Sequence, residues 1–257
     1  MSIPKIIHYC WFGPNPIPEM EKKCIQSWKR HLPDYEIIFW NESTFDVKSV
    51  DYVKQAYSCG KYAFVSDYVR INALYRFGGI YLDTDVEVLR SLDEFLENEA
   101  FIGFENRTMV GTGIIGAEKN NAILGAMLDY YHANPFINEK GYMDMTTNVK
   151  ILYKLLVLNG FESEDREQRL KGIHIYKREY FCPKKIGKNE FKVTEHSAVI
   201  HHFSGSWLTE KEKKRGNSLI WRNVFRPLLR KIREILLKIL DEDTVKNFEM
   251  ELRNKMR

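Results

Sequence analysis

Residues 77–85 read FGGIYLDTD, and this stretch decides the fold class that the sequence predicts. The glycine pair at 78–79 is typical of a helix C-cap, so a helix should end there. The apolar run 80–82 has the pattern of a short buried strand, and it leads directly into Asp83 and Asp85. Carboxylates are costly to bury without a cation, so this order is typical of a ligand site at the carboxyl edge of an α/β sheet.

Strands and helices alternate on both sides of this stretch. Apolar runs at 5–11 and 35–40 are typical of strands, and the helical period of 19–30 lies between them. This strand–helix–strand order predicts a βαβ unit and a parallel sheet in an α/β fold. Further helices are expected at 50–58, 61–76, 122–133 and 147–159, and further strands at 100–105, 111–116, 172–176 and 197–203.

The composition is that of an ordinary globular protein. Of the 257 residues, 44% are apolar and 29% are charged, which excludes disordered, collagen-like and coiled-coil proteins. The longest apolar runs are only a few residues, so no membrane-spanning helix is expected, and the N-terminus shows no signal-peptide pattern. The four cysteines have no CxxC spacing, which predicts reduced thiols in a cytoplasmic protein rather than disulfides or a zinc site.

The charge is unevenly distributed along the chain. A net charge of +4 is too small to indicate nucleic acid, so no such partner is expected. Residues 208–257 hold 14 Lys and Arg against 8 Asp and Glu, a net of +6, so residues 1–207 sum to −2. The helical period of 218–240 mixes basic and apolar residues. We therefore expect a main domain at 1–207 and a basic amphipathic helical tail, the C-terminal extension, at 208–257.

The tail permits more than one interpretation. A basic amphipathic helix can lie on an anionic membrane, which would make the protein peripheral on the inner face of the cytoplasmic membrane. It can also pack its apolar stripe against the main domain and leave its basic face in water. A binding or dimerising role for the tail is a third interpretation that the sequence leaves open.

Three separate motifs resemble those of glycosyltransferase family 32, in the same order. The signature block at 63–85, AFVSDYVRINALYRFGGIYLDTD, has Ser-Asp before an Arg and then Gly-Gly-x-Tyr-x-Asp-x-Asp. The opening strand at 3–13 and the segment IHHFSGSW at 200–207 are similar too, and related motifs occur in clostridial glucosylating toxins. The resemblance implies a GT-A fold with a Rossmann-like, mostly parallel sheet flanked by helices. It also implies a nucleotide-sugar donor, a divalent metal and transfer with retention of configuration.

The acidic pair is the expected metal site. Hard oxygen ligands suit Mg²⁺ or Mn²⁺ holding a diphosphate, although an isolated Asp-x-Asp occurs by chance in many proteins. The resemblance implies that Asp83 and Asp85 hold Mn²⁺, or Mg²⁺, together with a late histidine. His201 and His202 point to opposite faces of a strand, so at most one of them can join the pair. His201 fits the spacing of family 32 and His202 that of the related family 8, and both remain candidates.

The helix before the acidic pair carries an acid and a base. Asp67 and Arg70 are three residues apart and share one helix face, and this spacing by itself indicates an intrahelical ion pair. By the resemblance, Asp67 binds hydroxyls of the donor sugar, Arg70 contacts the sugar or the diphosphate, and Ser66 is a neighbouring polar contact. Together with the acidic pair, Asp67 and Arg70 form the expected catalytic set.

Three aromatic residues complete the expected donor site. By the resemblance, Trp11 stacks on the nucleobase, Tyr81 belongs to the donor-binding block, and Trp207 contacts the diphosphate. For the two tryptophans, simple core packing is the alternative. His8 is interpreted as a core histidine that is hydrogen-bonded to the backbone. A UDP-sugar is the favoured donor, and a GDP-sugar is the second candidate.

The acceptor side is less well defined. Residues 146–148 read TTN where many family members have Gly-Pro, and Thr147 is expected to be a helix N-cap. The run GTG at 111–113 permits close approach of the backbone, so it can form the floor of an acceptor site or a tight turn. The acceptor that we expect is a glycan or a lipid-linked glycan.

The sequence thus predicts a metal-dependent retaining glycosyltransferase in cell-surface polysaccharide synthesis, such as capsule formation. One alternative is a non-catalytic nucleotide- or carbohydrate-binding protein on a degenerate scaffold, which the intact charged residues of the signature block disfavour. Another is a metal-dependent phosphohydrolase that uses water as the attacking group, which Trp11 and the Ser-Asp-x-x-Arg block disfavour. A toxin-like enzyme that modifies host protein is a further alternative, although the basic tail favours a glycan acceptor.

Overall fold

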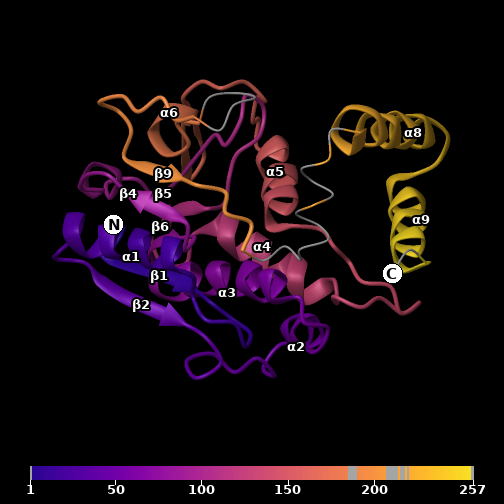
Figure 1. The fold of residues 1–257 in the computed structure, drawn as a ribbon, viewed down its shortest axis with the longest axis horizontal. Helices are drawn as coiled ribbons and strands as arrows, with labels where there is room; N and C mark the ends of the chain where they lie inside the picture. Colours follow the sequence, from indigo (N-terminus) through magenta and orange to yellow (C-terminus); the bar gives the residue numbers. More distant parts are fainter. Residues whose placement is uncertain (1, 185–189, 207–213, 215–217, 219, 256–257) are drawn as a thin grey trace. The chain divides into compact units, whose positions relative to one another are not determined.

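Figure 1 shows the fold of the chain in a computed structural model. The structure describes residues 2–184, 190–206, 214, 218 and 220–255. Two compact units make up the chain: the core unit holds residues 1–135 and 146–203, and the C-terminal unit holds residues 136–145 and 204–257. The expected domain border between residues 207 and 208 stays a prediction.

A seven-stranded sheet forms the centre of the core unit (Figure 1). Its strands are β1 (Ile6–Cys10), β2 (Glu36–Trp40), β3 (Gly79–Leu82), β5 (Ala100–Gly103), β6 (Ile114–Ala117), β7 (Gln168–Leu170) and β8 (Ile173–Tyr176). Their order across the sheet is β2-β1-β3-β6-β5-β8-β7. The pairs β1–β2, β1–β3 and β5–β8 are parallel, whereas β6 is antiparallel to β3 and β5, and β7 to β8. Five of the seven strands therefore point the same way, which confirms the predicted α/β fold with a mostly parallel sheet.

The longer helices of the core unit lie where the sequence predicts them, each within one residue at either end. They are α1 (Glu19–His31), α2 (Asp51–Ser58), α3 (Tyr62–Phe77), α4 (Ala122–Ala133) and α5 (Asn148–Leu158). Helix α3 ends because Gly78 adopts a φ of +69°, which residues with a Cβ rarely adopt, while its N–H donates to Leu74 O at 2.8 Å. The chain then turns directly into β3, so α3 and β3 carry the signature block as one rigid piece.

The shortest elements were not predicted. They are β4 (Val86–Val88), β7, the 3₁₀ turn η1 (Asp93–Phe95) and α6 (Arg178–Phe181). Strands of similar length that lie within a longer apolar run, such as β5 within residues 100–105, were predicted, whereas these four elements have no such run. One of these elements, β4, proves decisive for the candidate site.

A second, two-stranded sheet pairs β4 with β9 (Val199–His201), which lies within the predicted strand 197–203. The strands are antiparallel, with Val86 opposite His201 and Val88 opposite Val199. The ladder continues beyond β9, because the His202 N–H donates to Asp85 O at 3.0 Å. This pairing brings the late histidines to the segment that follows β3.

The interior of the core unit confirms the interpretation of His8. Its ring is fully buried and accepts a hydrogen bond from the Trp40 indole N–H at Nδ1, at 3.1 Å, so Nε2 carries the proton and donates to Gly78 O at 2.8 Å. Burial lowers the pKa of His8, so the ring is neutral near pH 7. All four cysteines have free thiols.

The C-terminal unit is helical, as the sequence predicts. A π-helical turn, η2 (Trp221–Phe225), leads into α8 (Arg226–Ile239), and α9 (Glu242–Lys255) follows. Pro227 lies in the first turn of α8, where its missing N–H costs nothing. Arg233 Nε lies 3.0 Å from Glu249 Oε1 and links α8 to α9. No helix in the described part of the chain is both long enough and apolar enough to cross a bilayer.

Candidate active site

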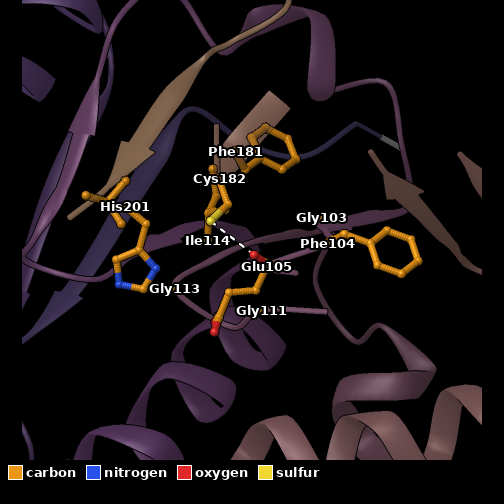
Figure 2. Close-up of a pocket in the computed structure, with 10 residues that line it drawn as sticks. Gly103, Phe104, Glu105, Gly111, Gly113, Ile114, Phe181, Cys182 and His201 are labelled. Carbon is orange, nitrogen blue, oxygen red and sulfur yellow. Dashed lines mark hydrogen bonds between the residues drawn. The ribbon is translucent and has the colours of Figure 1, made fainter. Parts of the chain in front are cut away.

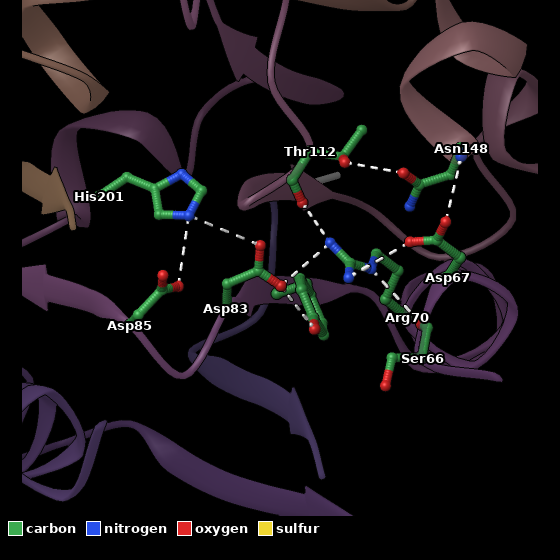
Figure 3. A network of polar contacts seen from close by, with 9 residues as sticks. Ser66, Asp67, Arg70, Asp83, Asp85, Thr112, Asn148 and His201 are labelled. Carbon is green, nitrogen blue, oxygen red and sulfur yellow. Dashed lines mark hydrogen bonds and ion pairs between the residues drawn. The ribbon is translucent and has the colours of Figure 1, made fainter. Parts of the chain in front are cut away.

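Five charged or titratable side chains meet beyond the end of β3, and we call this group the polar centre (Figure 3). It consists of Asp67 and Arg70 from α3, Asp83 and Asp85 from the segment after β3, and His201 from β9. The signature block contributes four of these residues, and the β4–β9 pairing adds the fifth. Sequence positions more than a hundred residues apart thus form one cluster.

The two aspartates and His201 form a group that can hold a metal ion. His201 Nε2 lies 3.2 Å from Asp85 Oδ1 and 3.9 Å from Asp83 Oδ2. One ligand atom from each of the three residues lies within 4.8 Å of the others. Burial lowers the pKa of His201, but its hydrogen bond to Asp85 and the neighbouring carboxylates outweigh burial, so the pKa is raised.

The two candidate histidines contact different carboxylates. His202 Nε2 lies 2.9 Å from Glu87 Oε2, on the other face of the strand from the acidic pair. The alternation of side chains along β9 therefore directs only His201 to Asp83 and Asp85. Sequence left both histidines open, and the structure places His202 outside the cluster.

Gly113 allows this close approach. A Cβ at this position would lie 2.8 Å from His201 Nδ1 and 3.1 Å from Asp83 Oδ2. The Gly113 carbonyl also accepts a hydrogen bond from the Asp83 N–H at 2.8 Å, which holds the acidic segment against the loop before β6. The expected close approach of the backbone is therefore present at Gly113, next to His201 and Asp83. A role of residues 111–113 as the floor of an acceptor site stays a prediction.

Arg70 is the cation of the polar centre. Its guanidinium lies 3.1 Å from Asp83 Oδ1 and 3.4 Å from Asp67 Oδ1, and Nη1 donates to Thr112 O at 2.8 Å. The intrahelical pair that the spacing indicates is present, but the arginine also bridges to Asp83. Its guanidinium carbon lies 4.4 Å from the centre of the Tyr81 ring, and the Tyr81 hydroxyl donates to Asp83 at 3.0 Å. These contacts hold the guanidinium in one position.

Asp67 joins the polar centre to the start of α5. Its Oδ2 accepts a hydrogen bond from the Asn148 N–H at 3.2 Å, so the carboxylate caps the helix. Thr147 occupies the N-cap position, but its side chain makes no capping hydrogen bond, which corrects the predicted capping role. The Asn148 amide oxygen accepts from the Thr112 hydroxyl at 2.8 Å, and its amide nitrogen is buried without a partner among the described residues. Sequence reasoning did not assign a role to Asn148.

The charges of the polar centre do not balance. Among these five side chains, three carboxylates face one guanidinium, which gives a net charge of −2 when His201 is neutral. Burial raises the pKa of Asp67 to about 6, against the opposing effect of Arg70. A divalent cation would supply the missing charge, and two carboxylates and an imidazole are a donor set that suits Mn²⁺ or Mg²⁺.

A further carboxylate, which sequence reasoning missed, lies beside this cluster. Glu105 lines the same hollow as His201 and Gly113, as Figure 2 shows, and the Cys182 thiol donates to its backbone oxygen at 3.3 Å. Burial raises the pKa of Glu105, and His201 opposes this. Glu105 lies two residues beyond the end of the buried strand β5, so an acid soon after a buried strand is a sequence signal that could have marked it.

The remaining predicted residues are less involved in the cluster. Ser66 contributes its backbone oxygen, which accepts from Arg70 Nε at 3.4 Å. Trp11 follows β1, and its indole N–H donates to Asn15 O at 2.7 Å within its own loop. Trp207 lies outside the described residues. The roles expected for Ser66, Tyr81 and the two tryptophans towards a donor stay predictions.

Comparison with known families identifies the first part of the chain. Residues 18–102 match the family described as glycosyltransferase sugar-binding region containing DXD motif. The match covers about a third of the chain, and this region is similar to that family. The matched region contains Asp67, Arg70 and the acidic pair, and it ends before Glu105 and His201. The DXD motif of the family corresponds to Asp83 and Asp85.

Individual relatives match only part of their length. Inositol phosphoceramide mannosyltransferase 3 of Schizosaccharomyces pombe is 34% identical over 48% of this chain and 35% of its own. Mannosyl phosphorylinositol ceramide synthase CSH1 of Saccharomyces cerevisiae is 33% identical over 45% of this chain and 31% of its own. The chain thus spans about a third of the length of these curated relatives.

Solved structures resemble the chain only loosely. The PaToxG glycosyltransferase is 24% identical and covers 50% of this chain and 60% of its own, with a TM-score of 0.43. A likeness at this level carries no argument about function, so the proposals below rest on the polar centre and on the family region.

Proposed function

We propose that this protein is a metal-dependent glycosyltransferase that moves a sugar from a nucleoside diphosphate sugar to an acceptor hydroxyl. The observation that carries the proposal is the cluster of Asp83, Asp85 and His201 beside Arg70, at the end of a strand in a glycosyltransferase sugar-binding region. The first two residues are the DXD motif of that region, and the third arrives from the far end of the core unit.

Asp83, Asp85 and His201 would hold the cation, which we propose to be Mn²⁺ or Mg²⁺. The charge count supports this assignment, because the polar centre lacks two positive charges. When bound, the cation would neutralise the negative charge that builds on the leaving diphosphate. Retention of configuration is part of the proposal through the family 32 resemblance.

Arg70 and Asp67 would act on the donor from the other side of the centre. Arg70 is held in one position by Asp83, Asp67 and the Thr112 carbonyl, so it offers a preorganised positive charge to an anionic leaving group. Asp67 is oriented by Arg70 and by the first amide of α5, which leaves its carboxylate placed to accept hydrogen bonds from sugar hydroxyls.

The donor and acceptor are proposed at the level of class. UDP-sugars are the favoured donors and GDP-sugars the second candidate. The curated relatives are named as mannosyltransferases of inositol phosphoceramide, which supports including mannose among the sugars and a lipid among the acceptors. We propose a glycan or lipid-linked glycan acceptor and a place in cell-surface polysaccharide synthesis, including capsule.

We further propose that α8 lies on the anionic surface of a membrane, on the cytoplasmic side. The helix exposes Leu228, Leu229 and Ile232 by 51%, 52% and 43%. It also carries five basic residues and one acidic residue, Glu234. Exposed apolar side chains interleaved with basic ones suit the boundary of a bilayer that contains anionic lipid.

Calorimetric titration tests the proposed function. UDP, GDP and CDP are titrated with and without Mn²⁺ into the wild type, Asp85→Asn and Glu87→Gln. We expect Mn²⁺-dependent binding of one nucleotide, loss of that binding in Asp85→Asn, and retention in Glu87→Gln, because Glu87 faces His202 instead of the cluster. Slow hydrolysis of the matching sugar nucleotides then identifies the sugar. If no nucleotide binds in the presence of the metal, the protein is a non-catalytic relative on the same scaffold.

A further inference from the structure

A strongly basic hollow lies in the core unit, apart from the polar centre. Five cationic side chains and two acidic ones line it. The hollow is open to solvent and is lined by Arg107, Asp165, Lys177, Arg178, Glu179, Pro183, Lys184, Lys192 and Thr194. We call it the basic hollow. Its side chains carry a net charge of +3, whereas the polar centre is acidic.

Most of the positive charge in the basic hollow has no counter-charge. Asp165 is used by Arg178, since its Oδ1 accepts the Arg178 N–H at 2.8 Å and its Oδ2 lies 3.6 Å from Arg178 Nε. Arg107, Lys177, Lys184 and Lys192 form no ion pair with any carboxylate of the described residues. Like charges gathered in one hollow raise its potential and favour a bound anion.

Arg178 has Asp165 as its counter-charge, but the 3.6 Å contact between Nε and Oδ2 is too long for a hydrogen bond. Its Nε is buried and has no hydrogen-bond partner among the described residues, although Nη1 donates to Lys184 O at 2.6 Å. A buried guanidinium N–H without an acceptor is costly. An anion in the hollow would supply acceptor oxygens to this arginine.

The walls of the basic hollow are held by hydrogen bonds. The Ser197 hydroxyl donates to Glu179 O at 2.8 Å, and the Lys192 N–H donates to Pro183 O at 2.7 Å. The Ala198 N–H donates to Tyr180 O at 2.8 Å, which ties the α6 segment to the strand that carries His201. The cations are thus presented by a fixed backbone.

The basic hollow is next to the proposed transfer site. The Lys184 amine lies 4.9 Å from the centre of the Phe203 ring, and that ring stacks on His201 at 4.0 Å. Phe181 and Cys182 line the hollow that contains His201, while the next residues of the chain, Pro183 and Lys184, line the basic one. A molecule that reacts at the polar centre can therefore reach the basic hollow with a second part.

We propose that the basic hollow binds a phosphate ester carried by the acceptor substrate. The inference deepens the proposed function, on which its assignment to the acceptor rests. The diphosphate of the donor belongs with Asp83, Asp85 and their cation, which leaves the basic hollow for a different anion. Several lysines around an arginine match the multiple oxygens and charge of a phosphate group. The phosphate can belong to a lipid headgroup or to a soluble sugar phosphate, since both present the same oxygens.

Binding of glucose 6-phosphate, with glucose as the neutral comparison, tests the hollow without any donor. The variant combines Lys177→Gln and Lys192→Gln, both on exposed side chains whose replacement does not disturb the core. The matched control combines Lys48→Gln and Lys119→Gln, which are equally exposed and do not line the basic hollow. We expect the first pair to weaken glucose 6-phosphate binding about tenfold and the control pair to leave it unchanged.

Two further measurements show whether the phosphate belongs to a lipid or to a soluble ester, and which of the two proposals fails if binding is not seen. In the first, phosphatidylcholine vesicles with and without phosphatidylinositol replace the sugar phosphate. If the Lys177/Lys192 variant loses more affinity for the vesicles, the ligand is a lipid headgroup. If it loses more affinity for glucose 6-phosphate, the ligand is a soluble ester. Equal affinity of the wild type and the Lys177/Lys192 variant in both arms overturns the proposal. Mn²⁺-dependent nucleotide binding is measured on the same samples, so a protein that binds phosphate but no nucleotide refutes the proposed function alone.

Discussion

The polar centre and helix α8 depart from ordinary burial in opposite directions. In the polar centre, charged side chains are buried: the side chain of Arg70 is 8% exposed and that of Asp67 is 13% exposed. On α8, apolar side chains are exposed, and Ile235 and Ile239 show 57% and 74% of their surface. Both departures cost free energy in the absence of a partner.

The difference lies in where the missing partner comes from. In the polar centre, Arg70 pairs with two of the carboxylates, and the cation that we propose would balance the charge that remains. Helix α8 has an internal ion pair to α9, but its apolar face requires a large surface. We therefore propose an ion and a small ligand for the compact buried charge, and a membrane surface for the extended exposed apolar face.

The largest effect is expected where the polar centre loses a ligand. We expect His201→Ala to weaken Mn²⁺-dependent nucleotide binding roughly 100-fold or more, because imidazole nitrogen is one of three protein donors. His202→Ala is the matched control, since its ring pairs with Glu87. Calorimetry measures the Mn²⁺-dependent nucleotide affinity of the two variants. Equal effects of both substitutions would contradict the assignment of His201 as a metal ligand.

A smaller effect is expected from the apolar face of α8. Leu229→Ser combined with Ile232→Ser should weaken binding to anionic vesicles roughly 30-fold, because two exposed apolar side chains can no longer enter the bilayer. Phe248→Ser combined with Leu252→Ser on α9 is the comparison, with similar exposure and fewer basic neighbours. Cosedimentation with vesicles measures both pairs. If the two pairs behave alike, α8 is not the membrane-facing helix.

Adding one methyl group tests the close packing of the polar centre. We expect Gly113→Ala to weaken Mn²⁺ binding about tenfold, since the new Cβ would displace His201 or Asp83 from the cluster. Gly125→Ala, in α4, introduces the same group 3.2 Å from the Tyr75 ring, which is not part of the polar centre, and should leave Mn²⁺ affinity unchanged. Metal titration followed by intrinsic fluorescence checks the pair, and unchanged affinity in Gly113→Ala would show that the cluster tolerates displacement.

The smallest effect is expected on stability, from Asp67→Asn. The pKa of Asp67 is about 6 in the folded chain and near 3.8 when unfolded, so the folded state holds the extra proton between these values. Its contribution to stability is full below pH 3.8 and is lost as the pH rises through about 6. Asparagine keeps the acceptor for the Asn148 N–H, so we expect a change within about 1 kcal/mol at neutral pH.

The pH dependence of stability shows whether the buried Asp67 carboxyl is protonated or ionised between pH 4 and 6. In Asp67→Asn the fall of unfolding free energy between pH 4 and 6 should become shallower, whereas the exposed Asp129→Asn should keep the wild-type slope. Urea unfolding across this range measures the slopes. An unchanged slope in Asp67→Asn would mean that its carboxylate is ionised throughout, and that the polar centre is better neutralised than its charge count indicates.

Local patterns were sufficient for four of the five residues of the polar centre. Asp67, Arg70 and the acidic pair belong to one helix–glycine–strand segment, so their mutual placement follows from the geometry of α3 and β3. The longer helices were predicted for the same reason, because eight or more residues display their period. Short elements such as β4 have no period to display, and β4 is the strand that receives His201.

By itself, the sequence determined the fold class, the residues of the signature block and the net basic charge of residues 208–257. Only the tertiary structure decided between His201 and His202, explained Gly113, and added Glu105 and the basic hollow. His202 contacts Glu87, which is 115 residues earlier in the chain. The register of β4 against β9 decides which face each histidine side chain takes. Register between distant strands depends on the packing of the whole core, which no local run of residues specifies.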